Sequence, residues 1–379
     1  MSWHIDHPPS ADDPEFTSQY ARRLGATSPT AGAGAVQIKT SPVLLLHGMN
    51  TTNGRMWCRD ATNGNLSQSD DWGVTWAHLR GLPTGTSQST MSSIREFNGY
   101  VYMAITKTAT SIVGIYRAPI VASGTTLVWE ASPVFEFPST NRTVNVKSTF
   151  CAGTQYLFVG TYSVSGAGVD DSRIYRSSNG TTWTECHGDD SGLGVKHVHA
   201  VAEDPYNAGH IYATFGDSGS PYFMRKSTDH GSTWTTVLTS IQWQAVQITF
   251  SQKWVYLASD RIGSLVFVFD RDTNTAYEAT RGYPFQIAVP GAAASTDRFY
   301  EIGYWGAVDP ATDVYYGSAM DTSTSGNTQG VFRVIQPGAP LELLHSKPTN
   351  GIGEFFIGNG YVWTGNWKFP LYQPVPCPK

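Results

Sequence analysis

The chain has 379 residues, a net charge of −5 and only 15% charged residues without a basic run, which argues against a nucleic-acid-binding surface. No apolar run approaches the ~20 residues of a membrane span, and the N-terminus lacks the basic and apolar regions of a secretory signal. With 38 glycines and 12 tryptophans, the composition indicates a β-rich, turn-rich protein, and no cofactor is expected.

Residues 1–34 precede every repeat in the chain and are predicted to form a docking arm. Asp13 can cap a short helix and Gly25 can end it, and apolar residues between them fall on one face. Residues 26–35 read as a flexible linker. Because a helix of about eleven residues is marginal alone in water, we expect the arm to dock on other subunits of an oligomeric assembly.

An apolar residue followed by an aromatic opens a short predicted strand seven times. The steps between the aromatics are 45, 56, 54, 44, 59 and 48 residues, and each copy follows a hairpin-like turn. A period of about 50 residues with several short strands per unit is typical of a β-propeller. We predict an all-β, seven-bladed propeller in which each motif lies in a second strand, with six blades as the alternative. The copies are MWCR at 56, VYMA at 101, LFVG at 157, IYAT at 211, VYLA at 255, VYYG at 314 and VWTG at 362.

The last motif leaves only residues 368–379 behind it, which suffices for one further strand but not for two. The missing outer strand can come from AVQIK at 35–39, which would remove an exposed sheet edge. The propeller is therefore predicted to span residues 35–379. The four cysteines lack zinc-ligand spacing. They are interpreted as four free thiols or, alternatively, as including a bridge between Cys58 and Cys377.

Three segments repeat turn-forming and aromatic residues at similar offsets. Asp and Asn accept bonds from nearby backbone N–H groups, Gly takes positive φ, and Trp pins a turn to the sheet beneath it. The pattern resembles the Asp-box (BNR repeat) of sialidases and related β-propellers, which implies a structural turn between the two outer strands, remote from the ligand pocket. The residues are Ser69, Asp71, Gly73 and Trp76; Ser177, Asn179, Gly180 and Trp183; and Ser227, Asp229, Gly231 and Trp234.

Polar and aromatic residues near the starts of the predicted inner strands are expected to line one face around the propeller axis. His197 and His199 share a face of one strand; with Asp217 they are alternatively a metal site, acid–base groups or a structural pair. Glu301 is a further catalytic candidate, because paired carboxylates hydrolyse glycosides. The ligand-binding candidates are Arg95, His197, His199, Trp243, Gln244, Tyr300, Glu301 and Glu354, and the second strands end with Asp60, Asp217, Asp260 and Asp321.

The predicted function is a non-catalytic propeller that binds a cell-surface or polymeric glycan, or a protein partner, within a larger assembly. The sialidase resemblance covers only the repeats, and the first blades contain no Arg-Ile-Pro string, so sialidase activity is not implied. A docking arm without a visible signal fits a virion component, such as a receptor-binding or minor tail protein of a phage; the cytoplasm is the other location. The alternative function is a glycoside hydrolase or polysaccharide lyase on the same scaffold.

Overall fold

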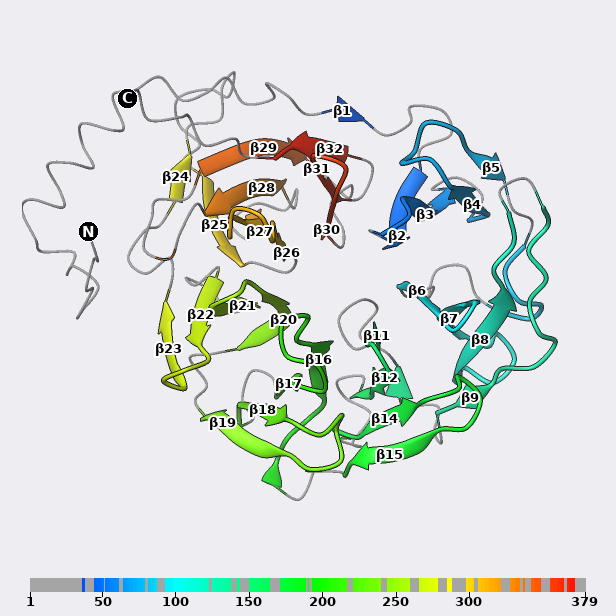
Figure 1. Cartoon of the computed structure of the whole chain (residues 1–379), viewed down its shortest axis with the longest axis horizontal. Helices are drawn as coiled ribbons and strands as arrows, with labels where there is room; N and C mark the ends of the chain where they lie inside the picture. Colours follow the sequence, from blue (N-terminus) through cyan, green and yellow to red (C-terminus); the bar gives the residue numbers. More distant parts are fainter. Residues whose placement is uncertain are drawn as a thin grey trace, which may run out of the picture.

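The fold is seen in a computed structural model of the chain (Figure 1). The described residues contain no α-helix, and hence none that could cross a membrane. The helix predicted within residues 1–34 lies outside the described part. The structure describes residues 36–37, 44–50, 52–60, 64–78, 81–86, 93–122, 125–137, 142–143, 150–163, 171–188, 190, 193–216, 221–239, 244–259, 266–278, 285–287, 298–302, 306–321, 328–334, 337, 342–348, 355–364 and 367–371.

Seven antiparallel sheets form the blades of a β-propeller, which confirms the predicted architecture and excludes the six-bladed alternative. Blade 1 comprises β2 (Leu44–Asn50), β3 (Arg55–Asp60), β4 (Leu66–Ser69) and β5 (Ala77–His78). Blade 2 comprises β6 (Ile94–Phe97), β7 (Tyr100–Thr106), β8 (Val113–Pro119) and β9 (Phe135–Glu136). Blade 3 comprises β11 (Phe150–Ala152), β12 (Leu157–Gly160), β14 (Ile174–Ser177) and β15 (Thr184–His187).

The remaining blades follow in chain order around the ring. Blade 4 comprises β16 (Val198–Glu203), β17 (Ile211–Phe215), β18 (Phe223–Ser227) and β19 (Thr235–Thr239). Blade 5 comprises β20 (Ala245–Phe250), β21 (Trp254–Ser259), β22 (Val266–Asp270) and β23 (Thr275–Glu278). Blade 6 comprises β26 (Gly306–Val308), β27 (Tyr315–Asp321), β28 (Thr328–Val334) and β29 (Glu342–Pro348). Blade 7 comprises β30 (Phe355–Gly358), β31 (Tyr361–Thr364) and β32 (Trp367–Pro370).

The ring is closed by both ends of the described chain. Consecutive inner strands touch from β2 through β6, β11, β16, β20 and β26 to β30, and β31 of blade 7 contacts β2 of blade 1. The fourth strand of blade 7 is β1 (Val36–Gln37), which pairs antiparallel with β32. Blade 7 therefore combines strands from the N-terminal and C-terminal parts of the described chain, and β1 covers the edge that β32 would otherwise expose.

Two further strand pairs extend blades 3 and 6 beyond their four strands. In blade 3, β10 (Arg142–Thr143) pairs with β13 (Tyr162–Ser163), just outside the β11–β12 pair. In blade 6, β24 (Phe285–Ile287) pairs with β25 (Arg298–Ile302), and β25 pairs with the end of β27. Both extensions lie where inner strands begin and second strands end, so they elaborate the same end of the blades.

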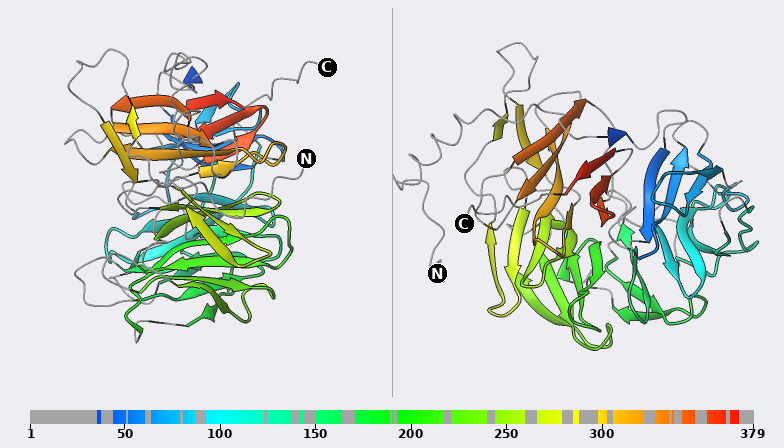
Figure 2. Two further views of the ribbon diagram at one scale, coloured as in Figure 1. Left: turned by 90° about the vertical axis from the view of Figure 1, so that its left-hand side faces the viewer. Right: turned by 45° about the horizontal axis from the view of Figure 1, so that its top comes forward.

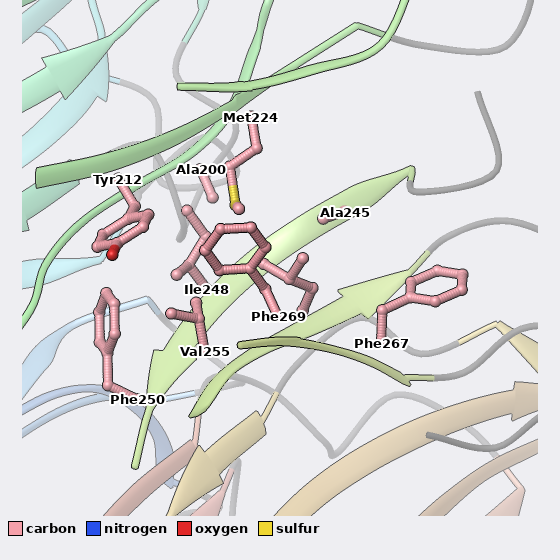
Figure 3. Close-up of a cluster of buried hydrophobic side chains, with 10 residues drawn as sticks. Ala200, Tyr212, Met224, Ala245, Ile248, Phe250, Val255, Phe267 and Phe269 are labelled. Carbon is pink, nitrogen blue, oxygen red and sulfur yellow. The ribbon is translucent and has the colours of Figure 1, made fainter. Parts of the chain in front are cut away.

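Seven clusters of buried apolar side chains lie between neighbouring blades, one at each interface. Sheets stack face to face in the edge-on view (Figure 2). Each cluster contains an aromatic from a second strand that packs on the next blade: Trp57, Tyr102, Phe158, Tyr212, Tyr256, Tyr316 and Trp363. Figure 3 shows Tyr212 of blade 4 beside Phe250 of blade 5.

The apolar–aromatic repeat lies in the second strand of every blade, as predicted. In blade 6, however, the aromatic of the repeat, Tyr315, faces the preceding blade. It stacks there on Tyr256 of blade 5 with ring centroids 5.1 Å apart. The next residue, Tyr316, packs on Phe355 of blade 7. Because successive strand residues point to opposite faces, Tyr316 rather than Tyr315 is the equivalent of the blade-linking aromatics in the other blades.

A basic residue lies opposite the blade-linking aromatic on the third strand in five blades. The pairs are Tyr102 with Arg117, Phe158 with Arg176, Tyr212 with Lys226, Tyr316 with Arg333, and Trp363 with Lys368. The Lys226 ammonium lies 5.4 Å from the Tyr212 ring centroid, and the Lys368 ammonium lies 4.9 Å from that of Trp363. Cations at such distances are attracted to aromatic faces. This attraction explains why a basic residue recurs opposite the aromatic on the third strand.

The predicted turns connect third and fourth strands and satisfy their own backbone. In the turn after β18, Ser227 Oγ accepts a hydrogen bond from the Gly231 amide at 2.8 Å. The Asp229 carboxylate accepts the Thr233 amide at 2.8 Å and the Thr233 hydroxyl at 2.7 Å, and these bonds lower the pKa of Asp229. Residues 69–75 repeat the same pattern of bonds after β4.

The glycine of each turn also contacts the blade-linking aromatic of the preceding blade. A Cβ on Gly73 would lie 3.7 Å from the Trp363 ring, and one on Gly231 would lie 3.2 Å from the Phe158 ring. Gly180 has φ of 75° and approaches Tyr102 so closely that a Cβ would collide with it. The glycines thus serve both turn geometry and blade packing.

Cys58 is a free thiol and fully buried in blade 1, so the proposed bridge to Cys377 is not formed. Burial raises the pKa of this thiol well above its usual value. Cys151 and Cys186 are also free, whereas Cys377 lies outside the described residues. The free-thiol interpretation therefore holds for three of the four cysteines.

Replacing Gly180 by Ala tests the contact between turn and aromatic. Gly99 is the matched control, because its φ is 78° and nothing lies within 4 Å of the position that a Cβ would take. Gly99→Ala should cost about 1 kcal/mol from backbone strain alone. Gly180→Ala should cost roughly 1–3 kcal/mol more because it overpacks Tyr102. Urea unfolding measures both; equal losses would contradict the contact.

Candidate functional site

His197 and His199 meet at the start of β16, where blades 3, 4 and 5 come together. Their Nε2 atoms lie 2.9 Å apart, and the side chains are 2% and 1% exposed. The His197 ring stacks on Tyr162 with centroids 3.7 Å apart. The Nδ1 atom of His199 lies 3.2 Å from the Ala245 carbonyl and 3.1 Å from the Tyr222 hydroxyl. The pair is therefore enclosed and hydrogen-bonded to its surroundings.

The buried pair is best explained as a structural element. If Nδ1 of His199 donates to the Ala245 carbonyl, Nε2 of His199 accepts the proton of His197, and one proton arrangement satisfies both rings. Burial, and next the neighbouring His197, lower the pKa of His199 well below its usual value. His199 is thus neutral at pH 7, and its hydrogen bond to the Ala245 carbonyl joins blades 4 and 5.

A metal site at this pair remains a prediction. The third expected ligand, Asp217, lies outside the described residues. Within the described ranges, no group of three or more His, Cys, Asp and Glu side chains is arranged to hold a metal ion. A carbonyl bonded to the second nitrogen of a histidine is a feature that metal sites share, but the bond between the two imidazoles explains the same geometry without a metal.

A second location, around Arg95, holds a half-open cavity of about 230 Å³. The lining residues come from the inner strands β2, β6 and β11 and from β3: Met49, Asn50, Trp57, Ile94, Arg95, Glu96 and Ala152. Arg95 is bonded through Nε to the Phe150 carbonyl at 3.0 Å. Among the described residues that line this cavity, Arg95 is the one predicted ligand-binding residue, and the continuous site expected from the sequence stays a prediction.

Glu96 is the polar centre of this cavity, and the sequence analysis missed it. Its carboxylate accepts hydrogen bonds from Asn50 Nδ2 at 2.8 Å and from Trp57 Nε1 at 2.8 Å, and Arg55 Nη1 lies 3.3 Å away. The Glu96 side chain is only 12% exposed. The sequence did contain a signal: Glu96 lies between apolar residues in the short strand IREF. A carboxylate that is buried there needs hydrogen-bond partners.

The other site candidates are placed only in part. Gln244 is buried immediately before β20, and Asp60 is buried at the end of β3. Tyr300 and Glu301 belong to β25, where the backbone register pairs Tyr300 with Asp321 of β27. Trp243, Asp217, Asp260 and Glu354 lie outside the described residues.

Comparisons with known proteins identify the fold alone. No family model and no curated protein matches the chain. Among solved structures, a GH74 xyloglucanase from Xanthomonas campestris is 15% identical with a TM-score of 0.56, covering 88% of this chain and 52% of that one. YCF48 from Cyanidioschyzon merolae is 15% identical with a TM-score of 0.53, covering 89% and 99%. A chain of the mitotic checkpoint complex is 8% identical with a TM-score of 0.53, covering 98% and 100%. This chain spans about half the length of the GH74 structure, and all three support a β-propeller.

The neutral state of His199 gives a testable pH dependence. Its pKa in the folded chain lies below the value of about 6.5 in an unfolded chain, so the unfolded state binds the proton more readily. The stability from this group is complete above pH ~6.5 and decreases as the pH falls below that value.

His199→Gln should remove this dependence. Between pH 6.5 and 5, the free energy of unfolding of the wild type should fall by up to about 1.4 kcal/mol per pH unit more than that of the variant. Urea titrations across this range measure the two slopes. Parallel slopes for wild type and His199→Gln would show that the ring is not buried as a neutral group.

Proposed function

We propose that this protein is a non-catalytic β-propeller that binds a glycan or a protein partner as part of a larger assembly. Residues 1–34 form the arm that mounts it, and residues 35–379 form the propeller. A virion, with the chain as a receptor-binding or minor tail protein of a phage, is the proposed location. The likeness of the three turns to the Asp-box supports placing the chain beside sialidase-like propellers, whose scaffold is used here for binding.

The observation that carries this proposal is the state of the polar groups near the inner strands. Glu96 accepts hydrogen bonds from two side chains and lies beside Arg55, and these contacts fix the direction of its carboxylate. His199 is buried and neutral. An acid–base catalyst needs a proton that it can gain and lose near working pH, whereas fixed donors and acceptors are what recognition requires.

Assembly with other proteins is supported at the level of the fold. A chain of the mitotic checkpoint complex has a similar propeller, so this scaffold is compatible with a role inside a complex. A fold alone does not assign a function. The docking role proposed for residues 1–34 is therefore argued from their sequence, which has a helix with a capping residue followed by a linker.

A glycoside hydrolase or polysaccharide lyase is the second candidate. The favouring observation is that β25 carries Glu301 next to Tyr300, whose register partner is Asp321. Two carboxylate-bearing residues therefore lie on adjacent strands, as glycoside hydrolysis would need. The structural likeness to a GH74 xyloglucanase is compatible with this candidate.

A glycan array followed by hydrolysis assays on the positive glycans separates the two candidates. We expect binding without turnover for the wild type. Glu301→Gln keeps the shape of the side chain but cannot act as acid, base or nucleophile, so it should leave binding unchanged. Detectable hydrolysis by the wild type that Glu301→Gln abolishes would establish the hydrolase instead.

Deleting residues 1–34 tests the arm. The propeller should stay folded, because β1 and all seven blades remain, and its melting temperature should be unchanged. The truncated chain should fail to enter the parent assembly when it is expressed in place of the full chain. Normal assembly of the truncated chain, measured by its presence in purified particles, would refute the docking role.

A further inference from the structure

The cavity around Glu96 has the chemistry of a carbohydrate subsite, and this inference rests on the glycan-binding function proposed above. Asn50, Arg95 and Glu96 present an amide, a guanidinium and a carboxylate to one cavity. Planar polar groups of these three kinds form paired hydrogen bonds. We propose that the cavity at the ends of β2 and β11, beside β6, binds a single sugar ring through two neighbouring hydroxyl groups.

The two hydroxyls are matched by a donor and an acceptor that lie side by side. Among the described residues, Asn50 Nδ2 spends one of its two N–H groups on Glu96 Oε2, and Glu96 Oε1 accepts one hydrogen bond, from Trp57. One N–H and one acceptor position on Oε1 are left. One sugar hydroxyl accepts from Asn50 while the adjacent hydroxyl donates to Glu96.

Both groups are held in place before any ligand arrives. The Asn50 Oδ1 atom accepts the Thr52 and Asn53 amides at 3.0 and 3.3 Å, which fixes the orientation of the side-chain amide. Glu96 is held by Trp57 and Arg55. Binding therefore costs little side-chain entropy, which favours affinity for a small ligand.

Size and lining restrict the ligand to one ring. The cavity of about 230 Å³ is smaller than the ~300–1,000 Å³ of sites for drug-sized molecules. Met49, Ile94 and Ala152 supply its apolar wall, which suits the C–H face of a sugar. A glycan would place one residue here and leave the rest of its chain in solvent.

The binding test uses the full chain and a panel of neutral and acidic methyl glycosides. Saturation-transfer NMR detects which glycosides bind, and titration of those glycosides gives their affinities. Ala152→Leu adds three carbon atoms to a residue that lines the cavity and removes no side-chain hydrogen bond. Glu96→Gln removes the charge of the acceptor. Both variants should weaken the best methyl glycoside at least tenfold.

The matched control is Glu203→Gln. Glu203 occupies the corresponding end of β16, where its carboxylate accepts the Thr154 hydroxyl at 2.9 Å and the Gly209 amide at 3.2 Å, but it does not line the cavity. Its substitution should leave affinity unchanged. Circular dichroism melts confirm that all three variants are folded.

The outcomes separate this inference from the function on which it rests. Glycan binding on the array that Ala152→Leu does not weaken would place the site elsewhere and overturn the inference alone. The same holds if array-positive glycans bind but no methyl glycoside competes with them. An array without any positive glycan, together with no methyl glycoside bound, would overturn the glycan-binding function itself.

Discussion

The contact on which the propeller depends is the insertion of one second-strand aromatic into the next blade. Tyr102, for example, is fully buried among Phe150 and Leu157 of blade 3. It faces Arg117 on its own third strand and leaves room only for a glycine at position 180 of the following turn. One side chain therefore joins two sheets, fills an interface and determines which turn can pack on it. Burial of such a ring contributes on the order of 2–3 kcal/mol at each interface.

This contact explains why the fold could be predicted from the sequence. The aromatic recurs once per blade because every interface needs it, and the turn residues recur because they bind one another locally, as Ser227 and Asp229 do. Local patterns of this kind are visible in a single chain. Blade 6 shows the limit: its tandem Tyr315 and Tyr316 share one motif, and only packing against blade 7 selects Tyr316.

The candidate sites were harder to predict, because they depend on contacts distant in sequence. His197 and His199 were selected for their chemistry, yet Tyr162 and Ala245 from two other blades enclose them. Glu96 was not among the predicted site residues, because its hydrogen-bond partner Asn50 is 46 residues away in the sequence. Titratable side chains reveal a function only through their surroundings, and those surroundings are assembled by the ring rather than by neighbouring residues.

The location of the cavity follows from the same geometry. Met49 and Ala152 lie at the ends of their inner strands, close to the hairpins that lead into second strands. These ends are tied between blades: Asn50 of blade 1 bonds Glu96 of blade 2, and Thr154 of blade 3 bonds Glu203 of blade 4. A cavity lies beside the first of these hydrogen bonds. At the second, the Glu203 carboxylate accepts hydrogen bonds from Thr154 and Gly209 of two hairpins. Equivalent bonds between blades therefore occur at both positions. A binding site on a propeller can arise by keeping such a bond and opening the space beside it.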